Sequence, residues 1–417
     1  MKLYNALSRQ IEPFTPGGPE VTLYVCGITP YDTTHLGHMF TYATFDLLVR
    51  YLEYQQWPVR YVQNVTDIDD DILRKAREVG EDWLALGNRW TAHFIEDLQA
   101  MNVRPPDHYP RATETIDEIV TTVQRLLHKG VAYESGGNVY FDLRQWPEFG
   151  QLSGIPAEEM LAVANERGNK PDDPHKKQPL DFVLWQAQTP GEPAWDSLWG
   201  PGRPGWHIEC STMSAQLLGN QIDIHGGGAD LIFPHHESEI AQSEAATGLK
   251  PFVRFWMHTA MVRHEGEKIS KSLGNLIMVR DLLRTWSPDA IRLYLGSHHY
   301  RQAWEYDEAD LAAAAQLAER LTAAVAASSP AGPVLDCGPC ERHFHEALDN
   351  DLDTPRAVRA LAEAADEIFA ALAYGRNVTA SQACLRRMAR VFGLRLDQAQ
   401  PEERVIAGWQ AHLSRFH

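Results

Sequence analysis

Two pairs of side chains, far apart in the sequence, have the chemistry to bind a triphosphate. His35 and His38 lie near the start, and Lys268 and Lys271 lie past the middle in a glycine-flanked, charged stretch. Imidazoles three residues apart share one face of a helix, and a helix N-terminus favours phosphate. Either pair alone is equally compatible with ordinary surface residues. Together, in this order, they indicate a site that activates a carboxylate with ATP, a reaction that depends on positioning and neutralising phosphates.

A second group of residues has the chemistry of a metal site. Cys26, Cys210 and His235 each lie at or just after the end of an expected strand, so they can meet at one sheet edge without zinc-finger spacing. Two thiolates and an imidazole suit tetrahedral Zn²⁺ with one open position, which would bind a substrate thiolate and select cysteine by its sulfur. Glu239, four residues after His235, is a candidate fourth ligand. The alternative is two buried free thiols.

A glycine run at 226–228 follows an expected strand and is followed closely by an acid, Asp230. Glycines allow a flat group to lie against the backbone, and the carboxylate can accept hydrogen bonds from ribose hydroxyls. A tight loop is the alternative interpretation.

The segment Cys337-Gly338-Pro339-Cys340 has the spacing of a redox CxxC site. It lacks a βαβ context and follows a Pro/Ser-rich stretch, so we interpret it as a feature of a loop. A remote alternative is an accessory metal site that uses His343 or His345.

The elements around the first pair of histidines form a βαβ unit. Residues 21–26 are β-rich and precede Gly27, apolar residues then recur at helical spacing from Leu36, and a second strand is expected at 59–65. This order predicts a parallel sheet of the nucleotide-binding type, with ligands at the carboxyl ends of its strands.

The expected fold is α/β, a Rossmann-like catalytic domain with an insertion, followed by an α-helical bundle. We assign residues 1–112 and 181–287 to the two halves of the catalytic domain, the second with the lysine loop. Residues 113–180 form the insertion, with the sheet resuming near Asp181, and residues 288–417 form the bundle. A chain of 417 residues is long enough for two or three such domains.

Composition narrows the class of protein. The net charge of −18 weighs mildly against a polyanion as the main partner, although a local basic groove is compatible with it. No apolar run approaches ~18 residues, and the start lacks the apolar region of a signal peptide, so we expect a cytoplasmic protein with no membrane partner. Five cysteines, an odd number, favour thiols or metal ligands over a disulfide framework.

Several motifs jointly resemble the class I aminoacyl-tRNA synthetases, and specifically their cysteine branch. The resemblance runs nearly end to end and rests on residues 24–29, 35–38, 64–70, 203–211, 225–230, 233–237 and 268–272.

Within this branch the motifs are similar to two kinds of enzyme. Thr29-Pro30-Tyr31, residues 39–42, Gln63 with Val65, and residues 166–171 and 184–188 resemble the mycothiol-pathway ligase that joins cysteine to the amine of glucosaminyl-inositol, and we expect that acceptor. Cysteinyl-tRNA synthetase, which uses tRNA, is the alternative, and Glu239 occupies the fourth zinc-ligand position of those synthetases. A remote alternative is a non-catalytic paralogue that binds nucleotide.

The resemblance implies a role for each matching position. Zinc would be held by Cys26, Cys210 and His235, and His35, His38, Lys268 and Lys271 would act on the phosphates of Mg²⁺-bound ATP. Contacts to cysteinyl-adenylate would come from Cys26, Gly27, Ile28, Thr29, Thr41, Asn64, Val65, Thr66, Trp206, Gly228, Ala229, Asp230 and Val262. The expected substrates are L-cysteine, ATP and glucosaminyl-inositol, and the resemblance implies a monomer.

Overall fold

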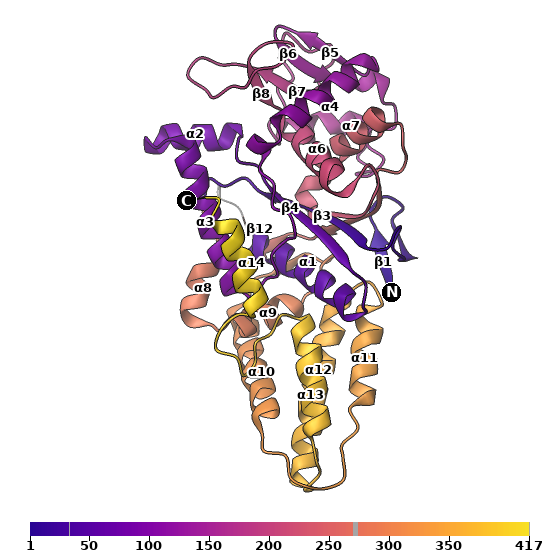
Figure 1. Ribbon diagram of the computed structural model, residues 1–417, viewed down its shortest axis with the longest axis vertical. Helices are drawn as coiled ribbons and strands as arrows, with labels where there is room; N and C mark the ends of the chain where they lie inside the picture. The colour runs from indigo at the N-terminus through magenta and orange to yellow at the C-terminus, as the bar shows by residue number, and fades with distance from the viewer. Residues whose placement is uncertain (33, 270–273, 417) are drawn as a thin grey trace.

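The computed structural model describes residues 1–32, 34–269 and 274–416. The molecule is elongated, with a parallel sheet in its middle, an antiparallel sheet at one end and a group of helices at the other (Figure 1). This arrangement confirms the α/β class and the helical C-terminal part that the sequence predicts.

The central sheet has the strand order β10-β9-β3-β4, with every pair parallel. Its strands are β3 (Val21–Ile28), β4 (Val59–Val65), β9 (Ile222–Gly228) and β10 (Val253–Thr259). Helix α1 (Leu36–Tyr54) connects β3 to β4, so the predicted βαβ unit is confirmed. Strands buried on both faces are mostly apolar, as β3 is apart from Thr22.

The antiparallel sheet corrects one expectation. Its order is β5-β6-β7-β8, and it consists of β5 (Ala132–Ser135), β6 (Asn138–Phe141), β7 (Phe182–Ala187) and β8 (Gly202–Pro204). The strand after Asp181 pairs with β6, with Val139 opposite Trp185, so the parallel sheet resumes only at β9. A short apolar run reveals a strand but not the sheet that it joins.

Helices join the two sheets. Helix α4 (Ile116–His128) of the insertion contacts α6 (Trp206–Leu218) and α7 (Glu237–Thr247), and α6 also contacts β3 and β4. The helix α5 (Ala157–Asn165) contacts the turn η4 (Ile232–His236). The helices that carry functional side chains, α6 and α7, are therefore held by contacts with α4, and α6 also by contacts with the central sheet.

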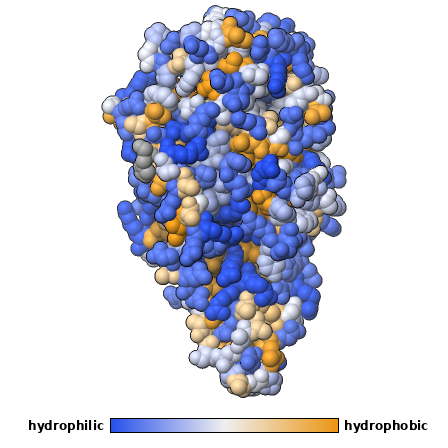
Figure 2. Space-filling view, in the orientation of Figure 1, coloured by the Kyte–Doolittle hydropathy of each residue, from blue (hydrophilic) through white to orange (hydrophobic). Residues whose placement is uncertain are grey.

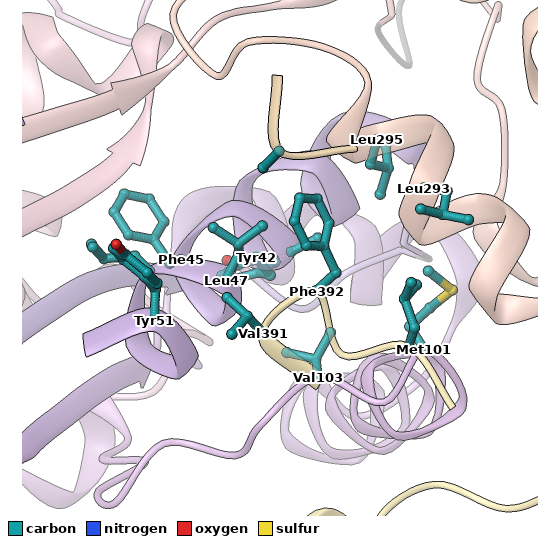
Figure 3. Close-up of a cluster of buried hydrophobic side chains, with 14 of the residues drawn as sticks. Tyr42, Phe45, Leu47, Tyr51, Met101, Val103, Leu293, Leu295, Val391 and Phe392 are labelled. Carbon is teal, nitrogen blue, oxygen red and sulfur yellow. The ribbon is translucent and has the colours of Figure 1, made fainter. Parts of the chain in front are cut away.

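The C-terminal helices share one core with α1. In Figure 3 side chains of α1, among them Tyr42 and Leu47, pack toward Leu295 of α9 and toward Phe392, which follows α13. The helices of this part are α8 (Val279–Thr285), α9 (Pro288–Gly296), α10 (Glu308–Ala326), α11 (Gly338–Leu348), α12 (Thr354–Ala373), α13 (Thr379–Val391) and α14 (Glu403–Leu413).

The last helix returns to the N-terminal half. Helix α14 packs on α3 (Trp83–Ala100), where Trp409 donates a hydrogen bond to the carbonyl of Val103 at 2.8 Å. The remaining elements are β1 (Lys2–Asn5), β2 (Gln10–Pro13), α2 (Asp70–Val79), β11 (Val262–His264), β12 (Glu267–Lys268) and β13 (Trp304–Glu305).

A buried ionic group fixes α1 against α9. Asp46 on α1 accepts hydrogen bonds from Arg50 at 2.9 and 3.0 Å, from the backbone N–H of Arg104 at 2.7 Å, and from Arg292 on α9. Burial alone would raise the pKa of Asp46, but the two arginines hold it below its ordinary value. The carboxylate therefore stays ionised inside the protein.

The face of the molecule seen in Figure 2 is mostly hydrophilic, with hydrophobic residues scattered over it. Within the described chain, no helix has the length and apolar character needed to cross a membrane.

Candidate active site

An extra residue in β3 directs Cys26 into the interior. Val25 pairs with Gln63 and Ile28 with Val65, so β3 has one residue more than β4 between these two pairs. Such a bulge changes the direction of a side chain. It is held by a hydrogen bond from the backbone N–H of Gly27 to Oδ1 of Asn64 at 2.8 Å and by one from the hydroxyl of Tyr42 to the Cys26 carbonyl at 3.2 Å.

The four predicted metal ligands converge. Sγ of Cys26 lies 3.9 Å from Sγ of Cys210 and 3.7 Å from Oε1 of Glu239, and Nε2 of His235 lies 3.2 Å from that same oxygen. One ligand atom from each of the four residues lies within 4.8 Å of the others, and all four residues are buried. Residues from β3, α6, η4 and α7 thus form one cluster. The expected position of Cys210 at a strand end of the same sheet is wrong, because it lies within α6, which follows β8 of the antiparallel sheet.

Two further histidines, which the sequence analysis did not include, contact the same cluster. Nε2 of His225 lies 3.5 Å and Nε2 of His236 lies 3.3 Å from Sγ of Cys26, and with Glu239 they make a second set of atoms within 4.8 Å. The sequence contained a signal for both: His225 directly precedes the glycine run, and His236 directly follows the predicted ligand His235.

Hydrogen bonds between imidazoles orient the histidines. Nδ1 of His235 lies 2.9 Å from Nδ1 of His207, and Nδ1 of His236 lies 2.8 Å from Nε2 of His258. A ligating imidazole is commonly oriented by a partner on its other nitrogen. Both His235 and His236 have this partner, but only the set that contains His235 also contains both thiols.

Burial controls the charge of the cluster. It lowers the pKa of His225 to about 3 and lowers that of His235 well below its ordinary value, so both imidazoles are neutral and have a free lone pair. Burial, reinforced by Cys210, raises the pKa of Cys26, and burial also raises that of Glu239. A bound divalent cation would favour the ionised forms of these groups, which burial disfavours. Two thiols, an imidazole and a carboxylate are therefore a donor set that fits a soft divalent metal.

The histidine pair starts α1 as predicted. His35 is the N-cap residue, its Nδ1 accepts a hydrogen bond from the N–H of His38 at 3.3 Å, and the two rings stack 3.7 Å apart. A Cβ on Gly37 would lie 3.1 Å from the His35 ring, so glycine gives this arrangement its space.

The segment that follows the expected lysine pair lies against the start of α1. The N–H of Leu36 donates to the carbonyl of Ile277 at 2.8 Å, and His35 pairs with Met278 as an isolated bridge. On the other side of the loop, the N–H of Ile269 donates to the carbonyl of Val262 at 3.1 Å. Lys271 lies outside the described residues, and only the backbone of Lys268, in β12, is described.

The residues expected to contact the adenylate lie around one edge of the central sheet. They lie at the carboxyl ends of the strands: Gly27, Ile28 and Thr29 at the end of β3, Asn64, Val65 and Thr66 at β4, Gly228, Ala229 and Asp230 at β9, and Val262 after β10. Thr41 on α1 joins this edge through a 2.7 Å hydrogen bond with Thr259. This is the edge where parallel sheets bind ligands.

Part of the glycine run gives space to other side chains of the protein. A Cβ on Gly226 would overlap the ring of Phe45, and one on Gly227 would lie 2.8 Å from Leu231 and 3.3 Å from His236. These two glycines give space to the protein's own side chains. A Cβ on Gly228 would instead meet the carboxylate of Asp230, a residue that lines the cavity described below.

A cavity of about 550 Å³ lies beside the thiol cluster, lined by Thr29, Asp69, Arg203, Trp206 and Asp230 among others. The Trp206 ring stacks on His235 with centroids 4.2 Å apart, so it contacts both the cavity and the cluster. A cavity of this size suits a small molecule.

Comparisons with known proteins agree with this geometry. The family described as "tRNA synthetases class I (C) catalytic domain" matches residues 13–316, and a "DALR domain" matches residues 343–397. The chain is 44% identical over 408 residues to the cysteine–tRNA ligase of Dehalococcoides mccartyi, covering 96% of this chain and 88% of that protein.

A second relative extends the match. The chain is 45% identical over 418 residues to the cysteine–tRNA ligase of Alkalilimnicola ehrlichii, covering 99% of this chain and 88% of that protein. Among solved structures, Mycobacterium tuberculosis methionyl-tRNA synthetase in complex with methionyl-adenylate shares the fold, with a TM-score of 0.65 at 17% identity over 96% of this chain and 91% of that one. The catalytic-domain family matches most of this chain, and the two relatives match nearly all of it at 44–45% identity. The chain therefore belongs to the class I (C) tRNA synthetase family of ATP-dependent, AMP-forming ligases.

Proposed function

We propose that this enzyme activates L-cysteine with ATP to cysteinyl-adenylate and pyrophosphate, and then transfers the cysteinyl group to the terminal ribose of tRNA with release of AMP. The observation that carries the proposal is the buried cluster of Cys26, Cys210, His235 and Glu239 beside the cavity. Its thiol-rich donor set suits recognition of a substrate by its sulfur.

The acceptor is the point at which this proposal departs from the motif-based expectation. Short motifs favoured the amine of glucosaminyl-inositol, whereas both relatives described above are named for charging tRNA. Glu239 supports the same choice, because its carboxylate lies in contact with Cys26 and His235, at the fourth ligand position expected of the synthetases. We therefore propose tRNA as acceptor.

We assign the metal to Zn²⁺, held by Cys26, Cys210 and His235 with Glu239 as fourth donor. When bound, it supplies a soft Lewis acid to which a substrate thiolate would add as a further donor, in preference to a hydroxyl. The Trp206 ring stacks on His235 and lines the cavity, so it connects the metal ligands to the space for the substrate. Serine, which differs from cysteine only in its hydroxyl, is disfavoured by chemistry more than by size.

The phosphates of ATP, with its accompanying Mg²⁺, are assigned to the start of α1. We assign His35 and His38, at this helix start, to donate hydrogen bonds to phosphate oxygens, to which the helix N-terminus would add its own N–H groups. We assign Lys268 and Lys271 to stabilise the charge that develops on the leaving pyrophosphate. Asp230 and Thr29, on the cavity wall, are placed to hold the adenylate.

Single-turnover transfer from preformed cysteinyl-adenylate tests the acceptor. With tRNA and glucosaminyl-inositol offered in parallel, we expect only tRNA to receive cysteine. If cysteine is transferred to the amine of glucosaminyl-inositol and none to tRNA, the proposal is wrong and the enzyme is an amino-sugar ligase.

Cysteine-dependent ATP–pyrophosphate exchange tests the cluster separately. Cys210→Ala should lower exchange by about 100-fold or more, because even the second-shell partners of a metal are commonly worth 10–100-fold. Cys340→Ala is the matched control, since both cysteines are buried on helices, with 1% and 2% of their surface exposed. Equal exchange in both variants would refute the assignment.

A further inference from the structure

A second cluster of thiols lies among the C-terminal helices, apart from the active site. Ligand atoms of Cys337, Glu341 and Cys384 all lie within 4.8 Å of one another. Cys337 caps the start of α11 and is half-buried, Glu341 lies one turn into that helix, and Cys384 is fully buried on α13. Two helices thus supply two sulfurs and a carboxylate to one point.

The carboxylate of Glu341 is fixed in place. Its Oε1 accepts hydrogen bonds from the hydroxyl of Tyr54 at 3.0 Å and from the guanidinium of Arg387 at 3.0 Å. Both donors act on one oxygen. Ligating carboxylates are commonly oriented by such outer donors, which raise the affinity of a site for its metal.

The charges also suit a cation. The guanidinium of Arg387 forms an ion pair with the carboxylate of Glu341 at 3.0 Å. With two thiolates and a carboxylate, a divalent ion together with Arg387 brings the group to neutrality.

We propose that Cys337, Glu341 and Cys384 form a second metal site, selective for a thiophilic divalent cation of the Zn²⁺ type. Two sulfurs and one carboxylate oxygen make three ligands of a tetrahedral site, and water completes it. Binding would release the thiol protons and connect α11 to α13. Through Glu341 it would also strengthen the contact with Tyr54, which ends α1.

Other residues near the CxxC segment have other contacts. Cys340 is absent from the ligand set and is buried among groups that include Glu367. His343 lies 3.5 Å from a carboxylate oxygen of Glu363, and Nδ1 of His345 lies 3.3 Å from the hydroxyl of Tyr51. The partner of Cys337 is therefore Cys384, across two helices, rather than Cys340.

Metal counting on the full-length chain tests this site. Protein reduced and handled without air is equilibrated with Zn²⁺, dialysed against metal-free buffer and analysed for bound zinc. We expect two equivalents in the wild type and loss of one in Cys337→Ser, a substitution that keeps a favoured N-cap residue and so leaves α11 able to form. Cys340→Ala, the matched control, should retain both equivalents.

A second set of variants separates this site from the active site. Cys210→Ser should lose the other equivalent, and Cys210→Ser combined with Cys337→Ser should bind none. Tyr54→Phe keeps all three ligands but removes one donor to Glu341, and we expect zinc to bind this site about 10-fold more weakly.

Three results would overturn the proposal. One is retention of all bound zinc in Cys337→Ser, and another is loss of one equivalent in Cys340→Ala. The third is a thiol titration of the reduced, zinc-free protein in which Cys337 and Cys384 react freely both without and with added Zn²⁺.

Discussion

Replacement of Gly27 by alanine tests whether the bulge in β3 builds the active site. A Cβ on Gly27 would overlap the carbonyl oxygen of Asn64 and lie 2.6 Å from its carbonyl carbon. The obstacle is backbone of the neighbouring strand, so no side-chain rotation relieves it. The variant must either push β3 away from β4 or flatten the bulge, and both changes move the side chain of Cys26.

The expected cost follows from the nature of this contact. Overpacking in a closely packed interior costs typically about 1–3 kcal/mol and occasionally more. Because Asn64 is 1% exposed and cannot move outward, we expect the upper end, about 3 kcal/mol, for Gly27→Ala. The effect is steric, because Gly27 is not among the glycines with positive φ.

Urea unfolding and cysteine-dependent pyrophosphate exchange measure the two consequences. Gly18→Ala is the control, since a Cβ there would meet nothing within 4 Å, and its φ is also not positive. We expect Gly18→Ala to match the wild type in both assays and Gly27→Ala to lose stability and exchange together. Wild-type stability in Gly27→Ala would refute the reasoning, because it would mean that the strands separate at no cost.

Three further outcomes are expected. Asp46→Asn leaves the buried Arg292 without its carboxylate, whereas Arg50 keeps Glu402 at 2.6 Å, and it should reduce the free energy of unfolding by about 3–5 kcal/mol, measured by urea titration. Burial raises the pKa of Asp69 to about 6, so its contribution to stability is fully present below about pH 4 and is lost as the pH rises through 6. The free energy of unfolding of the wild type should therefore fall by up to about 3 kcal/mol between pH 4 and 7. Asp69→Asn, which keeps an N-cap side chain, should abolish this fall, and a variant with the same pH profile as the wild type would contradict the reasoning. In a Cys337→Ser background, a strong chelator should abolish exchange and lower thermal stability, and added Zn²⁺ should restore both; a chelator-resistant enzyme would contradict the metal assignment.

Local periodicity was sufficient for the elements that hold the site. The β-rich run before Gly27 and the helical spacing after Leu36 predicted the βαβ unit. The i,i+4 spacing likewise placed Glu239 beside His235. These features depend on residues near in sequence. The approach of Cys210 to Cys26 has another cause than the expected meeting of strand ends, because Cys210 lies within α6, after β8 of the antiparallel sheet.

The features that the sequence analysis missed depend on long-range contacts. Whether the strand at β7 joins the parallel or the antiparallel sheet is decided by its pairing with β6, which local pattern does not encode. The approach of Cys384 to Cys337 is fixed by helix packing, so the CxxC spacing drew attention to the wrong partner. The ring of Phe45 occupies the space beside Gly226 for a similar reason, because the packing of α1 against β9 determines which side chain lies there.

One short unit connects the sulfur-binding and phosphate-binding parts of the site. β3 carries Cys26 at its bulge, and His35 is the N-cap of the next element, α1. The short connection between β3 and α1 therefore sets the distance between the sulfur-binding and the phosphate-binding residues. The far side of α1 is fixed by the ionic contact of Asp46 with Arg292 and by the core that it shares with the C-terminal helices. A rotation of α1 that displaced His35 would therefore break buried charge pairs. The C-terminal helices thus stabilise the geometry of a site to which they contribute no ligand in our assignment.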